Sequence, residues 1–182
     1  MKVLLLEDDP FFANQIVNVL CGERKITYQV EHKATAGEAI EYLQSNIIDI
    51  AIIDLNLPDS KGLDTFIKIH QAQRDIPVII LSGDEDELLA LRAVKIGAQD
   101  YLMKRDVKSN LLIRAIHYAI QRRLERKQAE QALKNSAEEL KNRNEELSDA
   151  NKKLQIEIAN RKKAEEDLKI SQSNLNVIMD NT

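Results

Sequence analysis

Glycine, proline and aromatic residues are scarce in this sequence and are confined to its first part. All five glycines and all three prolines lie within residues 1–97, and the last aromatic residue is Tyr118. Beyond Tyr118 the chain consists almost entirely of leucine, alanine, isoleucine, charged, amide and serine residues, a composition typical of a long helix or coiled coil. We therefore divide the chain into a globular part, 1–120, and a long helical part, 121–182.

The single cysteine, the charge balance and the apolar runs exclude several protein classes. Cys21 alone cannot form an internal disulfide, and its place at the end of an apolar helix pattern predicts a buried, unreactive thiol. No apolar run approaches the length of a membrane span, and the opening KVLLL leads directly into acids, unlike a signal peptide. Residues 1–120 carry 13 basic and 18 acidic side chains and 121–182 carry 13 and 12, so neither part favours direct nucleic-acid binding. We expect a cytoplasmic protein without membrane contact.

Short apolar strands alternate with helix-period segments in the globular part. The predicted strands are Val3–Leu6, Ile26–Glu31, Ile50–Ile53, Pro77–Leu81 and Asp100–Met103. Helix patterns lie near 10–21, 35–45, 62–73 and 84–96, and another begins near 108. This alternation predicts an α/β fold: a five-stranded, doubly wound parallel sheet, flavodoxin-like, of order 2-1-3-4-5. The second strand is the most polar, as an edge strand would be, whereas the first and third are almost wholly apolar.

Polar side chains stand where the predicted strands end. Five of them follow four of the strands: Glu7, Asp8, Asp54, Ser82 and Lys104. Because the carboxyl ends of parallel strands meet at one edge of the sheet, we expect these groups to lie close together. Asp54 is the hardest to explain as structure alone, since an acid at the end of a buried strand is costly without a partner. Asp9, directly before Pro10, instead predicts a helix N-cap.

Three carboxylates, a hydroxyl and a lysine suit phosphoryl transfer to a carboxylate. Converging carboxylates repel one another and recruit a cation, and a site of few oxygen ligands at a phosphate position suits Mg²⁺. Lys104 and Ser82 would each contact a phosphoryl oxygen. Asp54 would then be the nucleophile that forms an acyl phosphate.

Four stretches, VLLLEDDP, IAIIDLNLPDSKG, PVIILSG and GAQDYLMKRD, resemble in order and spacing the receiver domain of bacterial two-component response regulators. The resemblance covers about residues 1–120 and implies that Asp54 is the phosphoacceptor. It further implies the ligands of Mg²⁺: Asp8 and Asp54 directly, Asn56 through its backbone carbonyl, and Glu7 through water. It also implies that Ser82 is the switch hydroxyl, Tyr101 the switch aromatic residue and Lys104 the phosphate-binding lysine.

The resemblance carries an expectation about function. The chain would accept a phosphoryl group from a cognate histidine kinase or phosphotransfer protein in a phosphorelay, and would be a signalling phosphoacceptor rather than an enzyme. Arg105 departs from the family, which usually places a proline after this lysine, often with a cis peptide bond. A cis bond before a non-proline residue costs ~3 kcal/mol, so we expect a trans bond here.

Leucines seven residues apart organise the helical part. The regular d positions are Leu133, Leu140, Leu147 and Leu154, and the same phase returns at Leu168 and Leu175. The a positions between them include Asn144 and Asn151. Leucine at d with asparagine at a is typical of a parallel two-stranded coiled coil, so we expect a parallel homodimer. The alternative is a solvated helix folded back on the globular part.

The predicted coil is imperfect at its start and near its end. Residues 125–131 offer little apolar surface, and Arg161 and Glu165 occupy core positions, as in the stutters that alter a supercoil locally. Arg122, Arg123, Arg126 and Lys127 are interleaved with glutamate, which predicts a solvated face of the coil.

The segment from 125 to 182 also resembles the signalling helix that precedes PAS sensory domains, with SNLNVIMDNT like the start of such a domain. We therefore expect an output domain beyond this sequence. Two alternative functions stay open. A constitutive coiled-coil scaffold would have a vestigial receiver. An aspartate-nucleophile phosphatase would need a second acid two residues after Asp54, where Asn56 stands.

Overall fold

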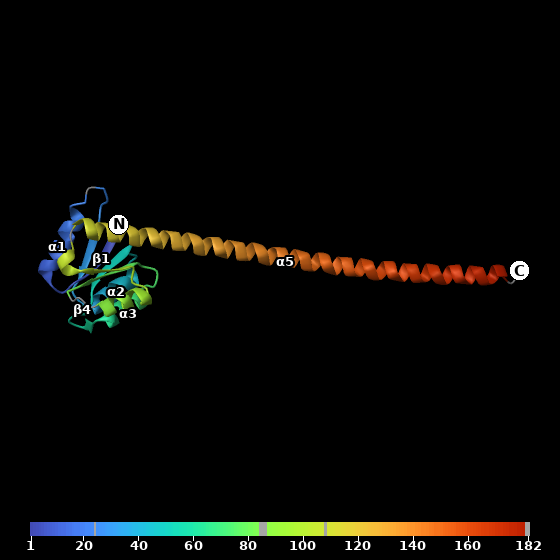
Figure 1. The fold of residues 1–182 in the computed structure, drawn as a ribbon, viewed down its shortest axis with the longest axis horizontal. Helices are drawn as coiled ribbons and strands as arrows, with labels where there is room; N and C mark the ends of the chain where they lie inside the picture. The colour runs from blue at the N-terminus through green and yellow to red at the C-terminus, as the bar shows by residue number, and fades with distance from the viewer. Residues whose placement is uncertain (24, 84–86, 108, 181–182) are drawn as a thin grey trace. The chain divides into compact units, whose positions relative to one another are not determined.

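The structure of the protein is a computed structural model. Its internal contacts divide the chain into two compact units, Met1–Lys127 and Gln128–Thr182. The structure describes residues 1–23, 25–83, 87–107 and 109–180 (Figure 1). The sequence composition predicts domains at 1–120 and 121–182. These boundaries remain a prediction, because the division above is one of internal contacts.

A five-stranded parallel sheet forms the centre of the first unit. Its strands are β1 (Lys2–Leu6), β2 (Gln29–Lys33), β3 (Ile50–Asp54), β6 (Val78–Ser82) and β7 (Asp100–Met103). Their order is β2-β1-β3-β6-β7, which confirms the predicted topology. A two-stranded antiparallel ribbon, β4 (Asn56–Leu57) and β5 (Ser60–Lys61), follows β3 where the sequence predicts only a turn.

Helices cover both faces of this sheet (Figure 1). In chain order they are α1 (Pro10–Cys21), α2 (Ala36–Ser45), α3 (Leu63–Ala72), α4 (Glu87–Ile96) and α5 (Ser109–Asp180). Side chains of α1 and the first turns of α5 pack on one face, and those of α2, α3 and α4 pack on the other. Because β1, β3 and β6 are buried on both faces, their near-continuous apolar sequence is what this architecture requires.

Helix α1 begins as the sequence predicts. The Asp9 carboxylate accepts a hydrogen bond from the Phe11 N–H at 2.9 Å, and Pro10 occupies the first turn. The prediction of a buried Cys21 is wrong, because the thiol is exposed. The helix buries Ala13, Ile16 and Leu20, and the position after Leu20 turns toward solvent.

The second strand lies further along the chain than predicted, at Gln29–Lys33 instead of Ile26–Glu31. Pairing with β1 sets this register, from Lys2 opposite Gln29 to Leu6 opposite Lys33. Ile26 and Tyr28, which suggested strand alternation, lie before the strand and pack into the core under α1 and α5. An apolar pattern near an edge strand therefore indicates which side chains contact the core, but it does not indicate which residues form backbone hydrogen bonds with the neighbouring strand.

Helix α5 continues through the whole second unit as far as Asp180. Every described side chain in 128–169 is exposed, including the d-position leucines and the asparagines at a positions. The side chain of Leu175 and those of the stretch SNLNVIMDNT lie outside the described part of the chain. Among the described residues, no helix is both long and apolar enough to span a membrane. The predicted cytoplasmic location stays a prediction.

Candidate functional site

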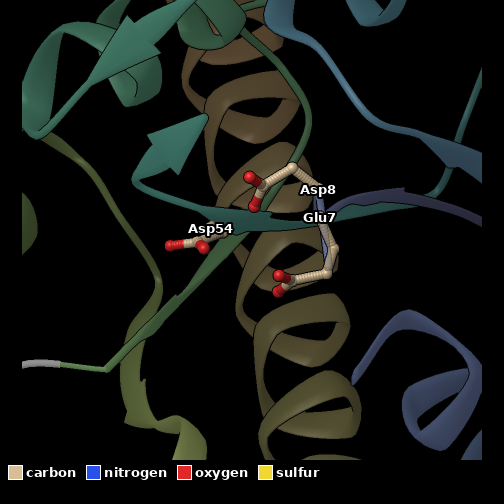
Figure 2. Close-up of side chains that lie close together, drawn as sticks. All are labelled: Glu7, Asp8 and Asp54. Atoms are coloured by element: carbon tan, nitrogen blue, oxygen red, sulfur yellow. The ribbon is translucent and has the colours of Figure 1, made fainter. Parts of the chain in front are cut away.

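Three carboxylates gather at the carboxyl ends of β1 and β3 (Figure 2). Glu7 and Asp8 directly follow β1, and Asp54 is the last residue of β3. One ligand oxygen from each of the three lies within 4.8 Å of the others. Glu7 is fully buried and Asp54 is 5% exposed, whereas Asp8 is exposed. The sheet edge that the sequence predicts is therefore the place where these acids meet.

Lys104 joins two of these acids. Its Nζ donates to Glu7 Oε1 and to Asp54 Oδ2, both at 2.7 Å. Lys104 follows β7 directly, so the parallel strand order brings it back to the same edge, and its Nζ lies 4.8 Å from the centre of the Phe12 ring. The ammonium group balances one of three formal negative charges and leaves two.

Burial and pairing act in opposite directions on the ionisation of these groups. Burial raises the pKa of Glu7, an effect that the hydrogen bond from Lys104 offsets only in part. Burial acts to lower the pKa of Lys104, but hydrogen bonds to Asp54 and Glu7 outweigh it and raise that pKa. Lys104 is thus held as a cation, while burial alone disfavours the Glu7 carboxylate.

The residues present fit a divalent cation. Glu7 Oε2 is buried and has no hydrogen-bond partner among the described residues, which is costly for a carboxylate oxygen. The donor set consists of carboxylate oxygens with an excess of two negative charges, and such oxygen sites suit Mg²⁺. Asp54 Oδ1 accepts the Asn56 N–H at 3.1 Å, so the backbone turns sharply beside the acids.

The remaining predicted residues lie on neighbouring strands. Ser82 ends β6 next to β3 and is buried. Tyr101 lies on β7, opposite Ile80 in the register, and its half-buried ring packs against the core under α2, α3 and α4. The peptide bond between Lys104 and Arg105 is trans, as expected, and a single turn of 3₁₀ helix, Lys104–Asp106, follows β7.

Sequence reasoning missed the residues that hold the loop after Asp54. Asp59 accepts hydrogen bonds from the Ala36 and Gly37 N–H groups at 2.9 and 2.8 Å, which ties this loop to the start of α2. Thr65, fully buried, donates its hydroxyl to the Leu55 carbonyl at 3.0 Å. These contacts span 23, 22 and 10 residues, so local patterns give no sign of the partners.

The receiver fold and the acidic cluster agree with sequence comparison. The profile of the response regulator receiver domain matches residues 3–117. The chain belongs to this family, whose members are the receiver domains of two-component response regulators.

Two relatives show the extent of the likeness. The transcriptional regulatory protein CitT of Halalkalibacterium halodurans is 31% identical over an alignment of 134 residues that covers 71% of this chain and 58% of that protein. The cell cycle transcriptional regulator CtrA of Caulobacter vibrioides is 32% identical over 125 residues, 67% of this chain and 51% of that protein. The chain spans about half the length of these curated relatives.

Solved structures show the same fold. A response regulator receiver domain protein from Clostridium thermocellum is 29% identical, with a TM-score of 0.59 over 66% of this chain and 94% of that one. The N-terminal domain of a three-domain response regulator/sensory box/GGDEF protein from Carboxydothermus hydrogenoformans is 27% identical, with a TM-score of 0.57. This second match also covers 66% of this chain and 94% of the other.

Proposed function

We propose that Asp54 is the phosphoacceptor of this receiver. The observation that carries the proposal is the Asp54 carboxylate itself, which ends a buried central strand and is paired with Lys104 beside Glu7 and Asp8. An Asp54 oxygen attacks the phosphorus atom of the donor, a new P–O bond forms, and the bond from phosphorus to the donor breaks. The product is an acyl phosphate on Asp54.

The surrounding residues have separate roles in this proposal. Asp8, Asp54 and the Asn56 carbonyl would hold Mg²⁺, with Glu7 acting through water; when bound, the ion neutralises the acids and polarises phosphoryl oxygens. Lys104 would turn its ammonium group to a phosphoryl oxygen, since it already lies 2.7 Å from Asp54 Oδ2. The Ser82 hydroxyl would bind another phosphoryl oxygen.

The metal requirement provides the first test. The chain is incubated with acetyl phosphate in Mg²⁺ or in EDTA, and intact-protein mass follows the gain of one phosphoryl group. We expect labelling only with Mg²⁺, and none in Asp8→Asn at the Mg²⁺ concentration that suffices for the unchanged protein. Asp64→Asn, an exposed acid on α3, is the matched control. Equal labelling in EDTA would contradict the metal site.

The phosphoryl donor in a cell would be a histidine kinase or a phosphotransfer protein, as is general for receiver domains.

We further propose that two copies of the chain form a parallel coiled-coil dimer through α5, in which each copy covers the leucine stripe of the other, the row of d-position leucines. The d-position leucines Leu133, Leu140, Leu147 and Leu154 are 55–73% exposed in the single chain. Asn144 and Asn151 at a positions would fix the register of the two helices.

The coil would pass the signal to a domain that follows. One of the solved structures with this fold comes from a protein named for a response regulator, a sensory box and a GGDEF domain, which supports an output domain after the coil. Phosphoryl on Asp54 would draw Ser82 toward it, and Tyr101 would turn inward. A shift of the equilibrium from 1:99 to 99:1 needs ~5.5 kcal/mol, more than these two side chains supply, so we expect an incomplete shift.

Spin labels test this transmission. Labels at Ala129 and Ser136 should change their distance between the two chains when beryllofluoride, a phosphoryl mimic, is added with Mg²⁺. A label next to Leu147, further along the coil, should change less. Unchanged distances at all three places would show that the coil only tethers the receivers.

A further inference from the structure

A small cavity lies at the edge of the sheet opposite the acidic cluster. Its volume is about 120 Å³. We call it the arginine pocket; it is lined chiefly by His70, Arg74, Gln99, Arg122, Arg123 and Arg126. Two lining residues, Pro77 and Gln99, directly precede the amino ends of β6 and β7. Asp54, in contrast, lies at the carboxyl end of β3. The pocket therefore lies at the amino ends of the parallel strands and shares no residue with the phosphoacceptor site.

The charge of the arginine pocket is strongly positive. Four guanidinium groups line it, together with one carboxylate, Asp75, whose Oδ2 lies 3.7 Å from Lys127 Nζ. Burial lowers the pKa of His70, and the positive charges of Arg74 and Arg126 lower it further. Four guanidinium groups against one carboxylate give the pocket an excess of positive charge, which favours an anion there in a chain whose net charge is −4.

Two of the guanidinium groups are held in place by the receiver backbone. Arg122 donates to the Gln99 carbonyl at 2.9 Å, and Arg123 donates to the Asp49 carbonyl at 3.0 Å. Arg122 is nevertheless exposed and Arg123 is half-buried, so the solvated face that the sequence predicts keeps its solvent contact while these two guanidinium groups are anchored. Groups positioned before a ligand arrives lose less entropy when it binds, so this arrangement favours binding.

His70 lines the pocket and is held in place by its neighbours. Its Nδ1 is buried and has no hydrogen-bond partner among the described residues. The ring is held by stacking on Phe66, with 5.4 Å between ring centres and 16° between their planes. Gly97, with φ of 123°, lies against the ring in the loop before β7. A Cβ atom at this position would lie 3.8 Å from His70 Cε1. The imidazole is therefore held at the wall of the pocket, where its ring signals report an anion bound beside it.

We propose that the arginine pocket binds a small phosphate anion. Guanidinium groups match phosphate oxygens with paired N–H donors, and several such groups favour an anion of more than one charge. The volume limits the enclosed part to a phosphate or diphosphate group, which can come from the free inorganic anion or from a nucleotide. The anion would bridge Arg74, after α3, to Arg122 and Arg126 on α5. It would thereby fix this stretch of α5 on the receiver unit, independently of Asp54.

Titration of the full chain with inorganic diphosphate tests the proposal. EDTA is present throughout, so that no metal-bridged anion occupies the acidic cluster, and potassium chloride keeps the ionic strength constant. The readouts are the backbone amide signals of Gly97 and Gln99 and the ring signals of His70 in nuclear magnetic resonance spectra. We expect saturable shifts at these residues and an upward shift of the His70 pKa as the anion offsets the arginine charges.

Substitution of exposed arginines separates a site from general attraction. Arg74→Gln and Arg126→Gln should each weaken binding about tenfold or more, as the loss of a charge-assisted hydrogen bond implies. Arg143→Gln, an exposed arginine of the second unit, removes the same charge and should leave the affinity unchanged. Tighter binding of ADP than of diphosphate would identify a nucleotide as the source of the phosphate group, and weaker binding the free anion. No saturable shift, or equal affinity in all three variants, would overturn the proposal.

Discussion

Lys104 pairs with two carboxylates that burial has removed from water. Its Nζ is 2.7 Å from both Glu7 and Asp54, and neither acid is more than slightly exposed. A buried carboxylate without a partner is strongly destabilising, so the lysine has a structural role as well as the proposed role toward the phosphoryl group. The two roles respond differently to a metal ion.

Replacing Lys104 by methionine should therefore lower the free energy of unfolding when no metal is present. Loss of a buried partner costs roughly 3–5 kcal/mol, and we expect the lower end because the lysine is itself 21% exposed. Mg²⁺ should restore more stability to the variant than it adds to the unchanged protein. Urea unfolding followed by tyrosine fluorescence measures this, since all four tyrosines lie within residues 1–127. Lys152→Met, an exposed lysine of α5, is the control.

Asp59 holds the loop after Asp54 through two backbone N–H groups at the start of α2. These bonds, from Ala36 first and then Gly37, lower the pKa of Asp59 from its usual value. A lowered pKa in the folded state means that the stabilisation is present above the unfolded pKa. It is lost as the pH falls through the lower, folded value.

We therefore expect Asp59→Asn to be less stable than the unchanged protein at neutral pH, by less than about 1 kcal/mol because the carboxylate is exposed to solvent. The difference should stay constant down to about pH 5 and shrink below the usual pKa of 3.8. Urea unfolding at a series of pH values tests this, with Glu41→Gln as the control. A difference that grows toward low pH would contradict this role of Asp59.

At the scale of elements, the sequence predicts the central strands and most helices because each buries a continuous or periodic apolar pattern. β3 and β6 are buried along their full length and β1 from Val3 to Leu6, so their apolar composition alone identifies them. The apolar pattern predicts the second strand too early in the chain because Tyr28 is buried and Ile26 partly buried without either residue joining the sheet. The sequence predicts a buried Cys21 because this residue directly follows Leu20, the last buried position of α1, but the next position of the helix faces solvent.

The residues of the candidate site also fall into two groups, those that the strand pattern predicts and those that depend on partners elsewhere in the chain. Glu7, Asp8, Asp54, Ser82 and Lys104 could be predicted because parallel strands bring their carboxyl ends to one edge. Phe12, Asp59 and Thr65 could not, since their roles depend on partners in other elements. The arginine pocket could not either, because the backbone carbonyls that Arg122 and Arg123 bind lie 23 and 74 residues away in the sequence.

At the scale of the whole molecule, the oligomeric state depends on what covers the d-position leucines of the second unit. Each leucine side chain that becomes buried contributes ~1.5–3 kcal/mol. Four regular d leucines on each of two chains outweigh the cost of two asparagines at a positions. The chain should therefore be dimeric before phosphorylation.

Leu147→Asp tests the dimer, because it places a charge in the centre of the proposed seam. Light scattering at micromolar concentration should give twice the chain mass for the unchanged protein and a mass near that of one chain for the variant. Asn142→Asp adds the same charge at an outward position of the same helix and should remain dimeric. Equal masses for all three proteins would contradict the proposed coiled coil.

The phosphorylated residue can be identified directly by chemical mapping. After labelling with acetyl phosphate and Mg²⁺, borohydride reduction converts an aspartyl phosphate to homoserine, which peptide mass spectrometry locates in the sequence. We predict homoserine at position 54 alone, and none in Asp54→Asn. Homoserine at position 8, or a reduced product that persists in Asp54→Asn, would contradict the assignment of Asp54 as the phosphoacceptor.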